Sequence, residues 1–290
     1  MAGDRILQSS LLLVGPGRAG MALARSWVRA GGRLSGIVAR TRETASSAAT
    51  ELGTSPQSLE TVDPACDLLV LAVPDDRIAS VAAELARRTN CRFAFHLSGA
   101  LPAAILAPLS RQGVSLGSLH PLRAFTGDPR ETWRDALVAI EGEPDAVEAG
   151  ERLTAALGGL GHRIASESKP LYHAAATLVA GGSMALLSIA VRAAADAGLP
   201  EAEARPALAR LASDALAAAA LRPLRETFTG PVARRDARTV RAHRAVLAGR
   251  PDFWDLYRRL ARETLLATAG RGAEEEIGSI LDEPQPMRRP

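Results

Sequence analysis

Three glycines near the start of the chain have the spacing Gly-x-Gly-x-x-Gly, which can hold a phosphate group. They follow an apolar run from Leu11 to Val14 and open a segment with helical periodicity. In this context the first glycine permits a tight turn, the second lets the backbone approach a pyrophosphate, and the third allows a helix to pack closely on a strand. The alternative is a glycine turn with a purely structural role. The residues predicted to hold the anion through the N–H groups of the helix start are Gly15, Gly17, Arg18, Ala19 and Gly20.

The residues about 20 positions further on indicate which dinucleotide would fit this loop. A site for NAD usually has Asp or Glu there, which hydrogen-bonds the ribose 2′-hydroxyl group. Here the chain has Arg40, Thr41 and Arg42. Two guanidinium groups and a hydroxyl can bind a 2′-phosphate, which a carboxylate would repel. The sequence therefore predicts NADP as the cofactor; the alternative is a solvated helix start in an arginine-rich chain.

Another set of candidate cofactor residues follows a later apolar run, Leu68 to Val73. Val73, Pro74 and Asp75 stand where that predicted strand ends, and ligands of open α/β sheets lie at the carboxyl ends of the strands. We expect this backbone to line the cofactor and the Asp75 side chain to cap the next helix.

Two of the five histidines end predicted strands, and the only lysine precedes a long predicted helix. A histidine at a strand end can move a proton to or from a ligand or hydrogen-bond its carbonyl or carboxylate group, although a satisfied structural histidine is the alternative. The lysine would meet the substrate if its turn faces the sheet, and would otherwise be an exposed junction residue. The predicted catalytic residues are His120 as first choice, then Lys169, Ser98, His96 and His173. The histidines and the two cysteines show no metal-ligand spacing, so we expect no metal.

The elements that must position these residues change character near residue 165. Before it, apolar runs of strand length alternate with helical patterns, which predicts a doubly wound, largely parallel α/β sheet; after it, only helical patterns occur. We expect a cofactor domain over 1–165, an all-helical domain over 166–270 and a flexible tail over 271–290. The predicted strands are 10–14, 34–39, 68–73, 93–97, 114–119 and 137–140, and the predicted helices include 18–29, 42–52, 76–88, 102–111, 144–157, 170–197, 201–220, 236–248 and 253–268.

Length and composition exclude several classes of protein. The chain has 290 residues, 47% of them hydrophobic and 23% charged, which is typical of a folded protein of about two domains. With 35 basic and 32 acidic residues spread along the chain and only 3% aromatic residues, nucleic acid is not an expected partner. The only apolar run near the start, Leu11 to Val14, is too short for a secretory leader or a membrane span, and Cys66 and Cys91 are expected as reduced thiols. We therefore expect a cytoplasmic protein that does not bind a membrane.

Taken together, these segments resemble the Rossmann-like proteins with the DUF2520 domain, in the 6-phosphogluconate-dehydrogenase-like superfamily. The resemblance implies an NADP-binding domain, an all-helical C-terminal domain that commonly dimerises, and oxidoreductase activity on an unsettled substrate. Members commonly have Asn where this chain has Gly181. In related dehydrogenases a helix Asn near the nicotinamide assists substrate binding, so Gly181 puts that role in doubt here. Members also commonly have Gly where this chain has Arg235. The segments that carry the resemblance are 15–20, 73–76, 96–100, 117–122, 172–176 and 229–234, together with Asp236 and His243.

The function expected from these features is the transfer of a hydride to or from a small carbonyl, imino or hydroxy compound in a cleft between the domains. The His120-Pro121 pair also looks like that of prephenate dehydrogenases, which gives a more specific alternative. A regulator that binds NADPH without turnover is the alternative from another class, because fold does not settle function. The apolar stretch from Leu178 to Ala194 needs covering on several sides, so we expect a homodimer through the helical domain.

Overall fold

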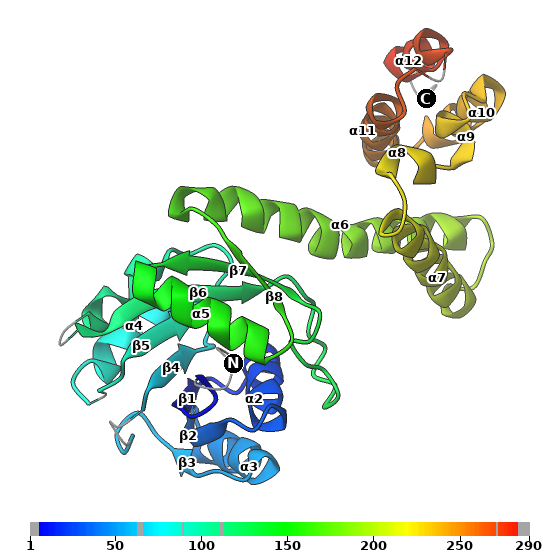
Figure 1. Ribbon diagram of the computed structural model, residues 1–290. Coiled ribbons are helices and arrows are strands. Elements are labelled where there is room, and N and C mark those ends of the chain that lie inside the picture. The colour runs from blue at the N-terminus through cyan, green and yellow to red at the C-terminus, as the bar shows by residue number, and fades with distance from the viewer. Residues whose placement is uncertain (1–5, 63–65, 89, 111–112, 271, 284–290) are drawn as a thin grey trace. The chain divides into compact units, whose positions relative to one another are not determined.

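The computed structural model describes residues 6–62, 66–88, 90–110, 113–270 and 272–283. Contacts divide the chain into two compact units, residues 1–180 and 181–290 (Figure 1). The division falls inside a long helix rather than at residue 165, because the first turns of that helix contact the sheet. The predicted order, an α/β sheet followed by a helical region, is confirmed.

In the part of the chain that the structure describes, eight strands form one sheet in the order β3-β2-β1-β4-β5-β6-β7-β8. Pairing is parallel from β3 through β6; β7 runs antiparallel to β6, and β8 runs parallel to β7. The strand order reverses direction at β1, which lies between β2 and β4, and such a switch point is where open α/β sheets bind ligands. The strands are β1 (Ser10–Val14), β2 (Arg33–Val38), β3 (Pro56–Gln57), β4 (Leu68–Leu71), β5 (Phe93–His96), β6 (Ser115–Pro121), β7 (Leu137–Gly142) and β8 (Leu160–Arg163).

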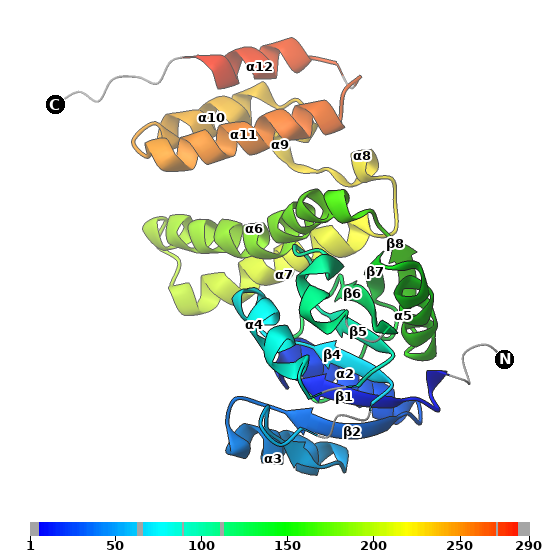
Figure 2. The ribbon, with the colours of Figure 1, turned by 90° about the vertical axis from the view of Figure 1, so that its left-hand side faces the viewer.

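Helices cover both faces of this sheet, which explains why its central strands are continuously apolar. In β1, Leu11 and Leu13 join the hydrophobic cluster of one face, and Leu12 and Val14 join that of the other. α2 (Arg18–Arg29), α3 (Arg42–Leu52) and α5 (Pro144–Ala156) pack on the first face, and α4 (Asp75–Leu85) and the 3₁₀ segment η1 (Ala103–Leu109) on the second. Figure 2 shows α4 and α5 on opposite sides of the sheet.

The remaining helices follow a short 3₁₀ turn, η3 (Ser166–Ser168), and include one that the sequence analysis placed in a flexible tail. That expectation was wrong for residues 274–282, which form a helix because Ile277, Ile280 and Leu281 recur at helical spacing and are buried against Trp254 and Val240. The rest of the predicted tail includes 271 and 284–290, which lie outside the described residues. The helices are α6 (Lys169–Asp196), α7 (Glu201–Ala219), α8 (Leu224–Thr227), α9 (Gly230–Ala233), α10 (Ala237–Leu247), α11 (Pro251–Ala267) and α12 (Glu274–Asp282).

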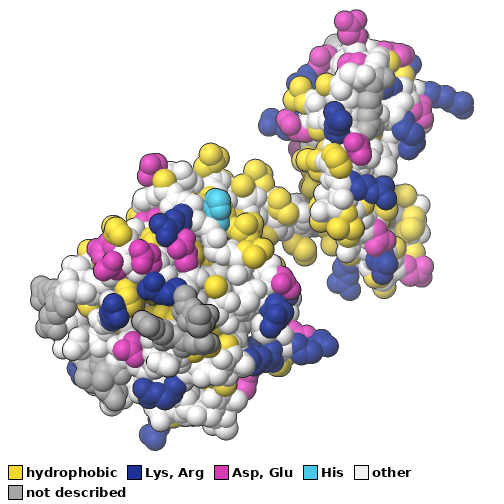
Figure 3. All heavy atoms as spheres, viewed as in Figure 1, with side chains coloured by type: hydrophobic (Ala, Val, Ile, Leu, Met, Phe, Trp, Pro, Cys, Tyr) yellow, Lys and Arg dark blue, Asp and Glu magenta, His cyan; other side chains and the backbone are white. Residues whose placement is uncertain are grey.

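α6 is strongly apolar and yet largely exposed. The segment Ser166–Asp196 contains an 18-residue window of mean hydropathy 1.9, of which 6% is buried, so by length and composition alone it could cross a membrane. Figure 3 shows hydrophobic side chains along this helix. The large exposed ones are Leu171, Leu178, Val179, Met184 and Leu186.

Candidate active site

The glycine loop between β1 and α2 has the geometry that a pyrophosphate requires. Gly15 has φ +93°, and a Cβ there would lie 2.6 Å from the Ala72 carbonyl oxygen at the end of β4. A Cβ on Gly20 would lie 2.4 Å from the Gly15 carbonyl oxygen, whereas one on Gly17 would meet nothing within 4 Å. Met21 N donates to Gly17 O at 2.8 Å, so the N–H groups before Met21 precede the helical hydrogen bonds and can face an anion. The loop therefore fits the diphosphate of a dinucleotide.

The candidate residues for a 2′-phosphate follow β2. Arg40, Thr41 and Arg42 are all exposed or partly exposed, and Thr41 is the N-cap of α3, where its Oγ1 accepts from Thr44 N at 3.2 Å. The cap leaves two exposed guanidinium groups at the carboxyl end of a strand next to the switch point. This set fits NADP, with Arg40 and Arg42 in reach of solvent.

The loop after β4 differs from the prediction by one residue. Pro74, not Asp75, is the N-cap of α4, and Asp75 is the first residue of that helix. The carboxylate of Asp75 instead accepts a hydrogen bond from Ser98 Oγ at 2.8 Å. Ser98 Oγ also accepts from Ala100 N at 3.2 Å and from Leu101 N at 3.1 Å. The Ser98 hydroxyl is thus fully engaged, and it orients the exposed Asp75 carboxylate.

His96 is 0% exposed, and both of its ring nitrogens meet the backbone. Nδ1 accepts from Ser98 N at 3.1 Å, so Nε2 carries the proton and donates to Pro102 O at 3.2 Å. Burial, and next the charge of Lys169, lowers the pKa of His96 to about 4. His96 therefore holds the 96–102 loop as a neutral imidazole, and its ring does not face a ligand.

This burial predicts an acid-sensitive fold. The unfolded chain takes up a proton on His96 as pH falls below the usual histidine pKa of 6.5, and the folded chain does so only near pH 4. Folding stability is therefore lost as pH falls through this window, by about 2 kcal/mol between pH 7 and pH 5 for this one group. Urea unfolding at both pH values should show a loss about 2 kcal/mol smaller in His96→Asn than in the wild-type protein. An equal loss in both proteins would contradict the assignment.

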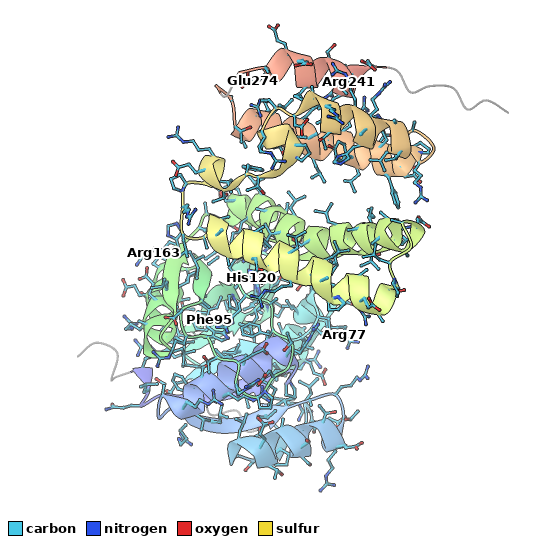
Figure 4. The ribbon with its side chains drawn as sticks, turned by 90° about the vertical axis from the view of Figure 1, so that its right-hand side faces the viewer. Arg77, Phe95, His120, Arg163, Arg241 and Glu274 are labelled. Carbon is cyan, nitrogen blue, oxygen red and sulfur yellow. The ribbon has the colours of Figure 1, made fainter. Side chains whose placement is uncertain are left out.

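His120 lies near the end of β6 (Figure 4). Its Nδ1 lies 2.8 Å from Tyr172 Oη, and the two rings meet edge to face at 5.5 Å. Tyr172 Oη also lies 3.4 Å from His120 O, to which it can donate. In that arrangement His120 Nδ1–H donates to the tyrosine oxygen, and Nε2 is an acceptor. Burial, and next His173 and Lys169, lowers the pKa of His120 to about 4, and burial raises the pKa of Tyr172 to about 12.

Gly99 brings His173 beside His120. A Cβ on Gly99 would lie 2.6 Å from His173 Nδ1 and 2.9 Å from His120 Nε2, so only glycine lets both imidazoles approach this backbone. Their ring centroids are 5.9 Å apart. His173 Nδ1 is buried and has no hydrogen-bond partner among the described residues. The sequence predicted both histidines as site residues, and the structure places them together.

Lys169 fits neither of the two environments considered for it from the sequence. It is 0% exposed, and its Nζ donates to Ser118 Oγ at 2.6 Å and to Ser98 O at 3.2 Å. Glu141 Oε2 lies 3.9 Å from Nζ and accepts from Ala103 N at 2.8 Å and Ser118 Oγ at 3.3 Å. Burial lowers the pKa of Lys169, which the Glu141 charge opposes. The buried ammonium therefore links the loop after β5 to β6 and β7.

Sequence reasoning missed three residues of this arrangement. Tyr172 could have been predicted, because it stands beside His173 at the start of the predicted helix 170–197, one turn after Lys169. Glu141 had a signal as the only charged residue in an apolar strand, Leu137–Gly142. Ser118 had none, since a serine inside a strand is common.

Comparisons with known proteins agree with this architecture. A Rossmann-like domain model matches residues 4–121, and the model of a domain of unknown function, DUF2520, matches residues 136–264, beginning inside the sheet at β7. The search of curated proteins found no match.

Solved structures share the fold along nearly the whole chain. A protein from Bacteroides fragilis described as a "putative NADP oxidoreductase" has a TM-score of 0.72 and 20% identity, covering 89% of this chain and 98% of its own. A protein from Thermotoga maritima has a TM-score of 0.74 and 22% identity, with the same coverage. A pyrroline-5-carboxylate reductase from Coxiella burnetii has a TM-score of 0.61 and 17% identity, covering 93% and 98%. At these identities the likeness shows the fold, and the family models add the domain: the chain is a Rossmann-like protein with a DUF2520 domain.

Proposed function

We propose that this protein is an NADP-dependent oxidoreductase that moves a hydride to or from a small carbonyl, imino or hydroxy compound. The observation that carries the proposal lies within residues 6–180. There the phosphate loop after β1 and the polar groups after β4, β5 and β6 all lie at the carboxyl ends of parallel strands around one switch point. Structures of this fold include NAD(P)-dependent reductases, which supports an enzyme.

In this proposal the chain's own residues bind and orient the reactants. The N–H groups of the α2 start hold the diphosphate, and Arg40 and Arg42 hold the 2′-phosphate. NADP, when bound, supplies or accepts the hydride. His120 contacts the reacting nitrogen or oxygen through Nε2. Lys169 and His96 hold the loop that carries Ser98 and Gly99, and Ser98 in turn holds the Asp75 carboxylate.

The proposal is tested by oxidation of NADPH with a panel of imines, ketones and 2-oxo acids, and by reduction of NADP⁺ with the corresponding amines and alcohols and with prephenate. Turnover with at least one class is expected. Prephenate is included because the prephenate-dehydrogenase-like alternative stays a prediction. NADPH binding without turnover on any of these compounds would favour the regulator instead.

The arginines after β2 predict a preference for the phosphorylated cofactor. Two charge-assisted hydrogen bonds of about 1.5 kcal/mol each exceed the 1.4 kcal/mol that a tenfold difference in affinity needs. NADPH should therefore bind at least about tenfold more tightly than NADH, by calorimetric titration. The double variant Arg40→Ala/Arg42→Ala should lose this preference, and Arg33→Ala, at the exposed opposite end of β2, should keep it. Equal affinities in the wild-type protein would refute the prediction.

The exposed apolar side chains of α6 support a homodimer, which we propose as the state that covers them. A stable interface buries about 1,200–2,000 Å² in total, and Leu178, Val179 and Met184 are 75%, 63% and 65% exposed in the single chain. Sedimentation at micromolar concentration without detergent should give twice the chain mass of 30.4 kDa. Leu178→Glu/Met184→Glu should shift the protein to monomer, and Leu221→Glu, outside α6, should not. Sedimentation of the wild-type protein as a monomer would contradict the dimer. Flotation of the protein with lipid vesicles would contradict it as well.

A further inference from the structure

The charges around His120 have a sign that restricts the substrate. The groups whose charges act most on the pKa of His120 are His173, Lys169 and Asp75; His96 also interacts with His120, and Tyr172 is hydrogen-bonded to it. Lys169 is 0% exposed, and its charge is paired with Glu141. The Asp75 carboxylate is exposed and is bonded to a neutral hydroxyl, Ser98 Oγ. Among these described groups of the first unit, the charge without an oppositely charged partner at ion-pair distance is therefore the negative one of Asp75.

Two consecutive residues, Ser98 and Gly99, connect Asp75 to the two histidines. Ser98 carries the hydrogen bond to the carboxylate, and Gly99 is the residue on which His120 and His173 pack. His120 is a neutral imidazole at neutral pH and Tyr172 is a neutral phenol, so neither would neutralise a negative charge on a ligand. A substrate carboxylate would meet repulsion here, and a cation would be attracted.

The protonation states of these groups suit some reductions better than others. Reduction of a neutral carbonyl needs a proton on oxygen. The pKa of His120 is about 4 and the pKa of Tyr172 is about 12, so the first is unprotonated and the second a weak acid at neutral pH. An imine that already carries a positive charge on nitrogen needs no proton in the reducing step.

We propose that the substrate is a cationic imine, protonated or alkylated on nitrogen, whose charge faces Asp75 and whose nitrogen lies near His120. The inference rests on the proposed function and names its substrate class. The imine carbon gains a hydride from NADPH and forms a C–H bond, while the electron pair of the C=N π bond becomes the lone pair of nitrogen. The positive charge of the substrate disappears, NADPH becomes NADP⁺, and the product is a neutral amine that takes up a proton from water after release.

The test uses a substrate with a fixed charge, N-methyl-1-pyrrolinium, and its neutral analogue of similar size, cyclopentanone. Asp75→Asn keeps an oxygen that can accept from Ser98 Oγ and removes the charge. We expect it to lower kcat/KM for N-methyl-1-pyrrolinium at least tenfold. The control Asp76→Asn, an exposed neighbour in the same helix, should stay within twofold of wild type. We also expect 1-pyrroline-2-carboxylate to be no better a substrate than 1-pyrroline.

A binding measurement gives a readout that does not depend on turnover. N,N-dimethylpyrrolidinium, a permanent cation of similar shape, should bind the full chain in calorimetry, and Asp75→Asn should weaken its binding at least fivefold while Asp76→Asn does not. Reduction of ketones or 2-oxo acids, with Asp75→Asn as active as wild type, would overturn this inference and leave the proposed function standing. A tenfold preference for the carboxylate-bearing imine would overturn it too. Failure of every compound to oxidise NADPH would overturn both.

Discussion

Replacing His120 with alanine is expected to lower kcat/KM at least about 100-fold for oxidation of an alcohol or amine by NADP⁺, in which the unprotonated imidazole accepts a proton. A positioned imidazole contributes about 10²- to 10⁴-fold by proton transfer, and a hydrogen bond to a charged group contributes about 1.5–3 kcal/mol. Pro121 restricts the His120 backbone and Tyr172 holds Nδ1 at 2.8 Å, so the ring is fixed, with Nε2 beside Gly99. Kinetics and NADPH titration on the same preparation measure the effect.

The affinity for NADPH should stay within a few-fold of wild type in this variant, because His120 lies apart from the phosphate loop. His162→Ala, which removes an exposed histidine on β8, is the matched control and should change neither property. On N-methyl-1-pyrrolinium, which has no proton to exchange, the loss in His120→Ala should be smaller. If NADPH affinity collapses in a folded variant, His120 is a cofactor ligand; if nothing changes, it is structural.

Replacing Lys169 with methionine is expected to lower the free energy of unfolding of the sheet-containing unit by about 3–5 kcal/mol. The variant leaves the buried Glu141 carboxylate, 7% exposed, without the cation beside it, and removal of one partner of a buried ion pair costs about this much. It also leaves Ser98 O and Ser118 Oγ without their shared donor. Lys169→Met/Glu141→Gln should recover a substantial part of the loss, since no buried charge is then unpaired.

Urea unfolding can report on this unit alone. Trp27 and Trp133 lie in it and Trp254 in the other, so tryptophan fluorescence in a Trp254→Phe background follows the unit that contains Lys169. A loss below about 1 kcal/mol for Lys169→Met would show that the ammonium is not the structural tie described above. A double variant no more stable than the single one would show that Glu141 is not its partner.

The local rules that the sequence obeys made much of the fold predictable. Glycine spacing predicts the β1–α2 loop, apolar runs predict the strands that end near His96 and His120, and Pro170 and Gly198 mark the ends of the long helix. Each of these features depends on neighbouring residues in the sequence. The side on which a side chain lies was harder to predict. Lys169 was assigned by its place before a helix, but its burial depends on Glu141, Ser118 and the Ser98 carbonyl, which come from three distant segments.

Two differences came from small competing signals. Proline at position 74 can begin a helix, and this moved the cap back by one residue and left the Asp75 carboxylate to meet Ser98 on the neighbouring loop. In the region beyond 270, acidic residues and glycines outweighed the short Ile277, Ile280 and Leu281 pattern, which is helical and buried. In both places the local composition suggested one structure and long-range packing determined another.

The most direct test of the account is transfer of deuterium from NADPH deuterated at the nicotinamide C4 to the carbon of an added imine or ketone, followed by mass spectrometry of the product. The account predicts one deuterium in the amine or alcohol formed by the wild-type protein. With His120→Ala at saturating NADPH, it predicts much slower incorporation of deuterium into substrates whose reacting nitrogen or oxygen exchanges a proton. Tight NADPH binding with no deuterium in any product would contradict it and would identify the protein as a binder of the cofactor instead of an oxidoreductase.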